Sequence, residues 1–132
     1  MATLIHLDTH AVVWLAAGDL SRFGSWVPSL LQQRGCAISP MVQLELDYLH
    51  EIARIKFSGA AIVQDLAAKI GMTMASSSFA SVVKEAAKLT WTRDPFDRIM
   101  CATARIANAP LLTKDGAILA NERCAFWDHC PA

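Results

Sequence analysis

Short apolar runs alternate with longer amphipathic stretches along this chain of 132 residues, and that alternation constrains the fold more than any other feature. Each apolar run is too short for a helix, whereas the stretches between runs have the apolar spacing of helices. Strands separated by helices pair in parallel, and the helices cover both faces of the sheet. We therefore predict an α/β fold with a mainly parallel central sheet of four or five strands and helices on both faces.

Local signals place the individual elements. Strands are predicted at residues 3–7, 36–38, 72–75, 111–112 and 125–127, and helices at 11–17, 25–33, 41–55, 58–68, 79–89 and 95–107. Ser39 before Pro40 and Asp94 before Pro95 are helix-start signals, because proline suits the first helical turn. Gly71 is a typical helix terminator. No repeat or linker interrupts this order, so residues 1–132 are expected to form one domain.

Composition excludes several classes of protein. Hydrophobic residues make up 54% of the chain and charged residues 18%, which is too apolar for a disordered chain. Because 12 basic residues balance 12 acidic ones, the chain does not hold nucleic acid mainly through a broad basic face. No stretch approaches the roughly 18 uncharged apolar residues of a membrane-spanning helix. We expect a soluble, cytoplasmic protein without a membrane-embedded part.

The cysteines give no strong signal. Cys36, Cys101, Cys124 and Cys130 form no CxxC pair, so a disulfide framework is not expected. Cys124 and Cys130 together with His129 are an irregular and incomplete ligand set for zinc. We favour the interpretation that these cysteines are buried thiols or thiols without a chemical role.

Four acidic residues stand where a parallel sheet would gather them. They are Asp8 after the first strand, Glu45 in the helix after the second strand, Asp97 in the first turn of a helix, and Asp115 after the strand at 111–112. Loops at the carboxyl ends of parallel strands carry ligand sites. Carboxylates gathered there repel one another unless a cation lies among them, and oxygen donors favour Mg²⁺ or Mn²⁺. This donor set predicts phosphodiester hydrolysis by water that the metal activates.

Each acid also has a purely structural interpretation. Asp8 could cap the helix that follows it, although an acid that ends a buried strand is more typical of a site. Glu45 could reach solvent from its helix, and Asp115 before a glycine could be a turn residue. Asp94 has the position of an N-cap, with Asp97 three residues later in the same turn. We therefore assign Asp94 to capping and Asp97 to the site.

Four segments together resemble a known family: LIHLDTHAVVWL, ISPMVQLELDYLHE, LTWTRDPFDRIMCATA and LLTKDG, in this order. They are similar to the PIN domain of VapC-type toxins from bacterial toxin–antitoxin pairs, over nearly the whole chain. The family's acidic positions fall on Asp8, Glu45, Asp97 and Asp115. The resemblance implies a PIN-like fold and a Mg²⁺-dependent endoribonuclease. In such an enzyme, Asp8 and Asp97 would be the principal metal ligands, and Glu45 and Asp115 would complete the pocket or bind the metal through water.

The resemblance also implies partners and supporting residues. The expected partners are an RNA substrate, a cognate antitoxin protein and a second copy of the chain, in a homodimer that assembles into a larger complex with the antitoxin. Thr9 and Thr113 would orient carboxylates or waters. His10, where many relatives carry asparagine, would contact substrate or metal-bound water.

Aromatic and basic residues around the DPFD segment have two interpretations. Trp91 and Phe96 could stack on RNA bases, or they could belong to the core or an interface. Arg93 and Arg98 could contact RNA phosphates, whereas Arg98 could instead pair with an aspartate of DPFD. The high apolar fraction and the apolar face of the predicted helix at 41–55 suggest surface that a second subunit or an antitoxin covers.

Two other functions fit the same acids. One keeps the nuclease fold in an RNA-processing role without a toxin role. The other is a non-catalytic, receiver-like module that binds Mg²⁺ without hydrolysing anything. A receiver-like module needs paired acids after the first strand and an acceptor aspartate after a central strand. Here Thr9 follows Asp8 and no aspartate ends the strand at 36–38, so the ribonuclease toxin is our prediction.

Overall fold

A computed structural model describes residues 3–131, and in these residues five short strands form one sheet. The strands lie in the order β3-β2-β1-β4-β5, and every neighbouring pair is parallel. Their bounds are β1 (Ile5–Leu7), β2 (Cys36–Ile38), β3 (Thr73–Met74), β4 (Leu111–Leu112) and β5 (Ala125–Phe126). The predicted α/β class with a mainly parallel sheet is confirmed.

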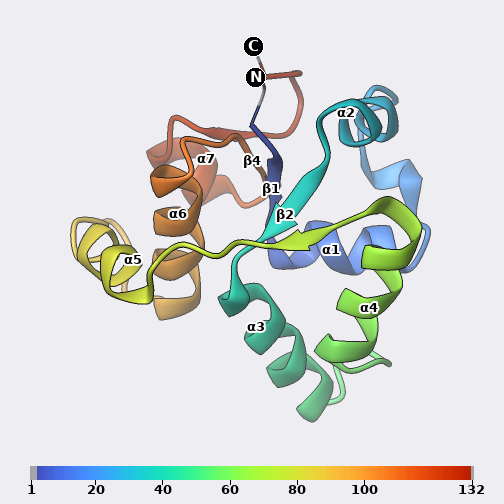
Figure 1. Cartoon of the computed structure of the whole chain (residues 1–132), viewed down its shortest axis with the longest axis horizontal. Helices are drawn as coiled ribbons and strands as arrows, with labels where there is room; N and C mark the ends of the chain where they lie inside the picture. Colours follow the sequence, from blue (N-terminus) through green and yellow to red (C-terminus); the bar gives the residue numbers. More distant parts are fainter. Residues whose placement is uncertain (1–2, 132) are drawn as a thin grey trace.

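Helices cover both faces of this sheet, as predicted. They are α1 (Thr9–Ala16), α2 (Val27–Arg34), α3 (Pro40–Glu51), α4 (Gly59–Ile70), α5 (Phe79–Ala86), α6 (Pro95–Ile106) and α7 (Gly116–Asn121), with a 3-10 turn η1 (Leu20–Arg22). Figure 1 shows α5 packed on α6 to one side of β1 and β2, and α1 with α4 to the other side, while α3 contacts both groups. Leu7, Ile38 and Leu112 are therefore completely buried in the sheet. Over the described part of the chain, no helix is both long and apolar enough to cross a membrane.

Side-chain caps confirm the predicted helix starts. The Ser39 hydroxyl accepts the N–H of Met41 at 3.1 Å at the start of α3. At the start of α6, the Asp94 carboxylate accepts the N–H of Phe96 at 2.8 Å and that of Asp97 at 3.4 Å. Both caps satisfy N–H groups that the first turn of a helix cannot pair.

The prediction of a helix over 41–55 is wrong at its end, because α3 stops at Glu51. Ala53 has a φ of 61°, and the Arg54 N–H bonds to the carbonyl of Leu49 at 2.8 Å. This is a Schellman-type helix end, in which glycine usually takes the left-handed position. An alanine there gives no sequence signal, which explains the error. The helix predicted at 79–89 likewise ends earlier, at Ala86, and η1 and α7 have no counterpart in the prediction.

The strand order places a crevice beside β1. The chain adds β2 and β3 on one side of β1, and β4 and β5 on the other. In receiver-like folds, by contrast, the first strand lies between the second and third strands, so this order is not that of a receiver-like module. Where the order reverses, the loops after the two central strands separate and leave room for a ligand. Here those loops follow β1 and β4.

Candidate active site

Asp8 lies at this point of reversal, and two donors hold its carboxylate. One oxygen accepts the N–H of Ala11 at 2.8 Å, so Asp8 is the N-cap of α1. The other oxygen accepts the hydroxyl of Thr113, which follows β4, so the bond bridges the crevice between β1 and β4. Asp8 is only 5% exposed. Burial raises its pKa, although the bonds from Thr113 and Ala11 oppose that rise.

Glu45 reaches the same region from α3. Its carboxylate accepts the hydroxyl of Thr9, the first residue of α1. Partial burial raises the pKa of Glu45, the bond from Thr9 opposes the rise, and the charges of Asp94 and Asp8 add to it. Thr9 and Thr113 thus each bind one carboxylate of the group and hold it at the crevice.

The pKa of Asp97 is strongly raised. Asp97 lies in the first turn of α6, half-buried, and its pKa rises to about 7. Burial is the main cause, and the negative charges of four other acids add to it: Asp94, Asp115, Glu45 and Asp8, in decreasing order. Acids from α3, α6 and the loops after β1 and β4 are therefore close enough to repel one another. The structure brings together the four acids that the sequence singled out.

Asp115 and Asp94 are exposed helix caps that also add negative charge near the site. Asp115 caps α7 by accepting the N–H of Ala117 at 2.9 Å and that of Ile118 at 3.0 Å. Its own N–H donates to the Thr113 hydroxyl at 3.1 Å. The capping role assigned to Asp94 is confirmed, but its charge also acts on the site. Sequence reasoning missed that second role because the cap alone explains the residue.

A hollow of about 310 Å³ opens beside two of these acids. Asp8, Asp115, His10, Trp14 and Lys114 line it. The rings of His10 and Trp14 lie 6.0 Å apart between centroids, and the Lys114 ammonium lies 6.0 Å from the Trp14 ring centre. His10 and Lys114 are exposed, so a cation and an imidazole are available next to the carboxylates.

The two arginines near the DPFD segment bond to backbone oxygens. The Arg98 Nε donates to the carbonyl of Thr92 at 2.8 Å. The alternative of an ion pair between Arg98 and an aspartate of DPFD is therefore wrong: among residues 3–131 Arg98 forms no ion pair, and its guanidinium faces the loop before α6. Arg93 donates to the carbonyl of Thr90 at 3.0 Å and remains exposed.

The aromatic residues of this region contact other parts of the protein. Phe96 stacks on Tyr48 of α3, with ring centroids 6.2 Å apart. Trp91 packs against the core, and its indole N–H donates to Glu122 at 3.1 Å. For Trp91 the interpretation as a core residue is therefore the one that the structure shows.

The chemistry of the acidic group suits a hard cation. Its donors are carboxylate oxygens, which Mg²⁺ and Mn²⁺ prefer, and their mutual repulsion is what a cation would relieve. Among residues 3–131, no three Asp, Glu, His or Cys side chains are arranged to hold a metal ion. This holds for Cys124, His129 and Cys130 too, and all four cysteines are free thiols.

Comparison with known proteins bears on the fold. No protein-family model and no curated protein matches the sequence. A chain of VapBC2 from Rickettsia felis, solved with a DNA fragment from its promoter, matches with a TM-score of 0.68 and 17% identity, over 96% of this chain and 100% of that one. A chain of DNA-bound VapBC from Salmonella typhimurium matches with a TM-score of 0.60 and 14% identity, over 93% and 95%.

PAE2754 from Pyrobaculum aerophilum also matches, with a TM-score of 0.61 and 21% identity, over 96% of this chain and 91% of that one. At such identities, structural likeness shows the fold alone. The chain has the PIN-like fold that the resemblance predicted. Its acidic group lies at the carboxyl edge of the parallel sheet in that fold.

Asp97 is expected to make the stability of the metal-free protein depend on pH. Its pKa is about 7 in the folded protein, against an ordinary value of 3.8. Between these values the folded protein binds more protons than the unfolded chain. The contribution of Asp97 is therefore fully favourable below 3.8 and is lost as the pH rises through about 7.

Urea denaturation in EDTA at a series of pH values measures this loss. Asp97→Asn is expected to make the fall in unfolding free energy shallower. Asp65→Asn removes a surface carboxylate of α4 that pairs with Lys69, and it is expected to leave the fall unchanged. An equally steep fall in the Asp97 variant would contradict the role given to this residue.

Proposed function

We propose that this protein is a Mg²⁺-dependent endoribonuclease and the toxin of a toxin–antitoxin pair. One observation carries the proposal: four carboxylates, of Asp8, Glu45, Asp97 and Asp115, act on one another at the crevice of a PIN-like sheet. Nothing in the part of the chain that the structure describes gives these acids a cation of their own as a permanent partner. A site of this kind suits a divalent metal and a phosphodiester.

In this proposal the role of each residue follows from its position in the site. Asp8 and Asp97 are the principal metal ligands, and Glu45 and Asp115 complete the pocket or bind through water. Mg²⁺, when bound, would activate a water molecule and neutralise charge on the phosphoryl group. Thr113 and Thr9 hold Asp8 and Glu45 in place before any ligand arrives.

Basic side chains near the pocket supply contacts to the substrate. Lys114 and His10 line the hollow next to Asp8, and exposed Arg93 stands in the loop before α6. In this proposal they bind phosphates of single-stranded or looped RNA. A few such contacts suffice where the metal holds the scissile phosphate, which agrees with a chain of formal net charge 0.

Exposed apolar side chains support the proposal that this protein binds protein partners. On α3, Leu44 is 56% exposed, and Phe79 at the start of α5 is 69% exposed. Both line an apolar groove of about 270 Å³ between α3, α5 and α6. Apolar surface of this kind is typical of protein interfaces. This surface supports the proposed homodimer, and together with the VapBC complexes among the similar structures it supports an antitoxin partner.

Incubation of the purified protein with end-labelled RNA tests the proposed activity. Cleavage is expected with Mg²⁺ or Mn²⁺, and none is expected with EDTA until excess Mg²⁺ is restored. Mapping of the cut ends then gives the sequence preference. Cleavage that persists in EDTA, or none with either metal, would contradict the proposal.

A further inference from the structure

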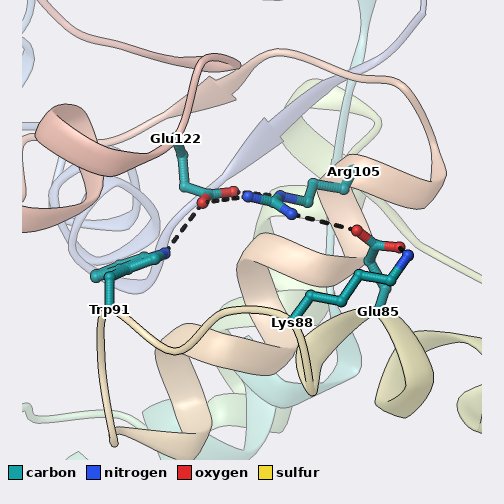
Figure 2. Close-up of polar contacts among 5 residues, drawn as sticks. All are labelled: Glu85, Lys88, Trp91, Arg105 and Glu122. Carbon is teal, nitrogen blue, oxygen red and sulfur yellow. Dashed lines mark hydrogen bonds and ion pairs between the residues drawn. The ribbon is translucent and has the colours of Figure 1, made fainter.

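The proposed site leaves one buried carboxylate unused. Glu122 directly follows α7, and its side chain is 1% exposed. Figure 2 shows Arg105 of α6 facing both of its oxygens, with Nε to Oε1 at 2.7 Å and Nη2 to Oε2 at 2.8 Å. Trp91 donates its indole N–H to Oε2 at 3.1 Å. A bidentate contact between a guanidinium and a carboxylate fixes the relative orientation of the two groups as well as their distance, because both groups are planar.

The segments that meet at Glu122 are the segments that carry acids of the site. The short helix α7 runs from its N-cap Asp115 to Asn121, directly before Glu122. Trp91 lies in the connection between α5 and α6, three residues before the N-cap Asp94. Arg105 lies on α6, the helix whose first turn contains Asp97.

The acids need such an anchor because they repel one another. The negative charges of Asp115, at the start of α7, and of Asp97, in the first turn of α6, repel each other, so their electrostatic energy falls if α7 moves away from the start of α6. A helix as short as α7 is not stable by itself. Its other inward contact is Ile118, which is buried but gives no directional bond. A directional bond at Glu122 therefore resists the separation.

We propose, on the basis of the proposed function, that Glu122 is a positioning residue: by binding Trp91 and Arg105 it fixes Asp115 relative to Asp94 and Asp97. Glu85 and Lys88, which extend this hydrogen-bonded network towards the surface, contribute much less to fixing these segments. Glu85 bonds to Arg105 at 3.2 Å and to Lys88 at 3.1 Å, and the Lys88 side chain is 64% exposed. Surface pairs of this kind constrain little.

Trp91→Phe is the variant that tests this role. Glu122→Ala would leave the Arg105 guanidinium without its main partner and could prevent folding. Phenylalanine at position 91 keeps an aromatic ring in the core but removes the N–H that binds Glu122. Trp26→Phe is the matched control: it makes the same change in a ring that stacks on Phe126 and that, within residues 3–131, donates no hydrogen bond.

Amide hydrogen exchange of the metal-free protein gives the first measurement. Trp91→Phe is expected to speed exchange about tenfold in residues 91–98 and 115–119, with β1 and α1 unchanged. This pattern reports local opening, whereas a general loss of stability would speed exchange in every protected segment alike. A uniform increase, or no increase, would overturn the proposal. Trp26→Phe is expected to leave both segments unchanged.

Titration with Mn²⁺ gives the second measurement, because groups that orient metal ligands are typically worth about 10–100-fold in metal affinity. Trp91→Phe is expected to weaken Mn²⁺ binding by about tenfold, and the cleavage rate is expected to recover at higher metal concentration. Unchanged Mn²⁺ affinity with unchanged exchange would overturn the positioning role. A wild-type protein that neither binds Mn²⁺ nor cleaves RNA would overturn the proposed function instead, and the exchange pattern would still decide whether Glu122 fixes these segments.

Discussion

Replacement of Asp8 by asparagine is expected to lower RNA cleavage by at least about 100-fold, since even groups that only support metal ligands contribute about 10–100-fold. The fold is expected to survive. Asparagine is as good an N-cap as aspartate, so the bond to the N–H of Ala11 remains. Its NH₂ group then takes the place of the second carboxylate oxygen and can donate to the Thr113 hydroxyl, which accepts as well as donates. Because Asp8 is buried and its pKa is raised, loss of its charge does not cost stability.

Rates of RNA cleavage in Mg²⁺ and melting temperatures of the same preparations test this expectation. Asp97→Asn is expected to behave in the same way, and both variants are expected to relieve the growth arrest that expression of a toxin causes. Asp65→Asn makes the same chemical change on the surface of α4 and is expected to keep full activity. Full cleavage by both the Asp8 and the Asp97 variants would exclude the acidic group as the active site.

The sequence predicted the sheet and the position of Asp8 for the same reason. Buried parallel strands are apolar runs with abrupt ends, and the first polar residue after such a run marks the carboxyl edge of the sheet. Asp8 after β1 is the clearest case. Glu45 was singled out by its place in the helix after β2, but a single acid on a helix has no distinctive pattern, and the resemblance to a known family strengthened its assignment. Its bond to Thr9 spans 36 residues, and no local signal predicts it.

Tertiary contacts account for what the sequence did not predict. In the sequence, nothing distinguishes Glu122 from an ordinary surface acid, because its partners Arg105 and Trp91 are 17 and 31 residues away. The end of α3 depends on one alanine in a left-handed conformation, which its residue type disfavours. Asp94 shows a further limit. The sequence correctly indicated a cap, but it did not indicate the effect of the Asp94 charge on Glu45, which arises only when α6 is packed against α3.

Removal of the Arg105 side chain is expected to cost unfolding free energy, up to the about 3–5 kcal/mol that is usual when a fully buried ion pair is broken on one side. Solvent screening lowers the cost here, because the Arg105 side chain is 35% exposed. In Arg105→Ala, the Glu122 carboxylate would keep only the N–H of Trp91, although it is 1% exposed. Domains of this size are stable by about 5–15 kcal/mol, so the variant is expected to be partly unfolded at elevated temperature. Urea denaturation at neutral pH measures the change.

Two further variants test whether the unpaired charge of Glu122 explains this cost. In the double variant with Arg105→Met and Glu122→Leu no charge remains buried, and most of the stability is expected to return, because apolar replacements of buried pairs are often neutral or better. Lys88→Ala removes only the exposed end of the network and is expected to cost less than about 1 kcal/mol. If the double variant were as unstable as Arg105→Ala, the lost ion pair and the Trp91 N–H left without its acceptor would be the larger contribution. The unpaired carboxylate would then not explain the loss.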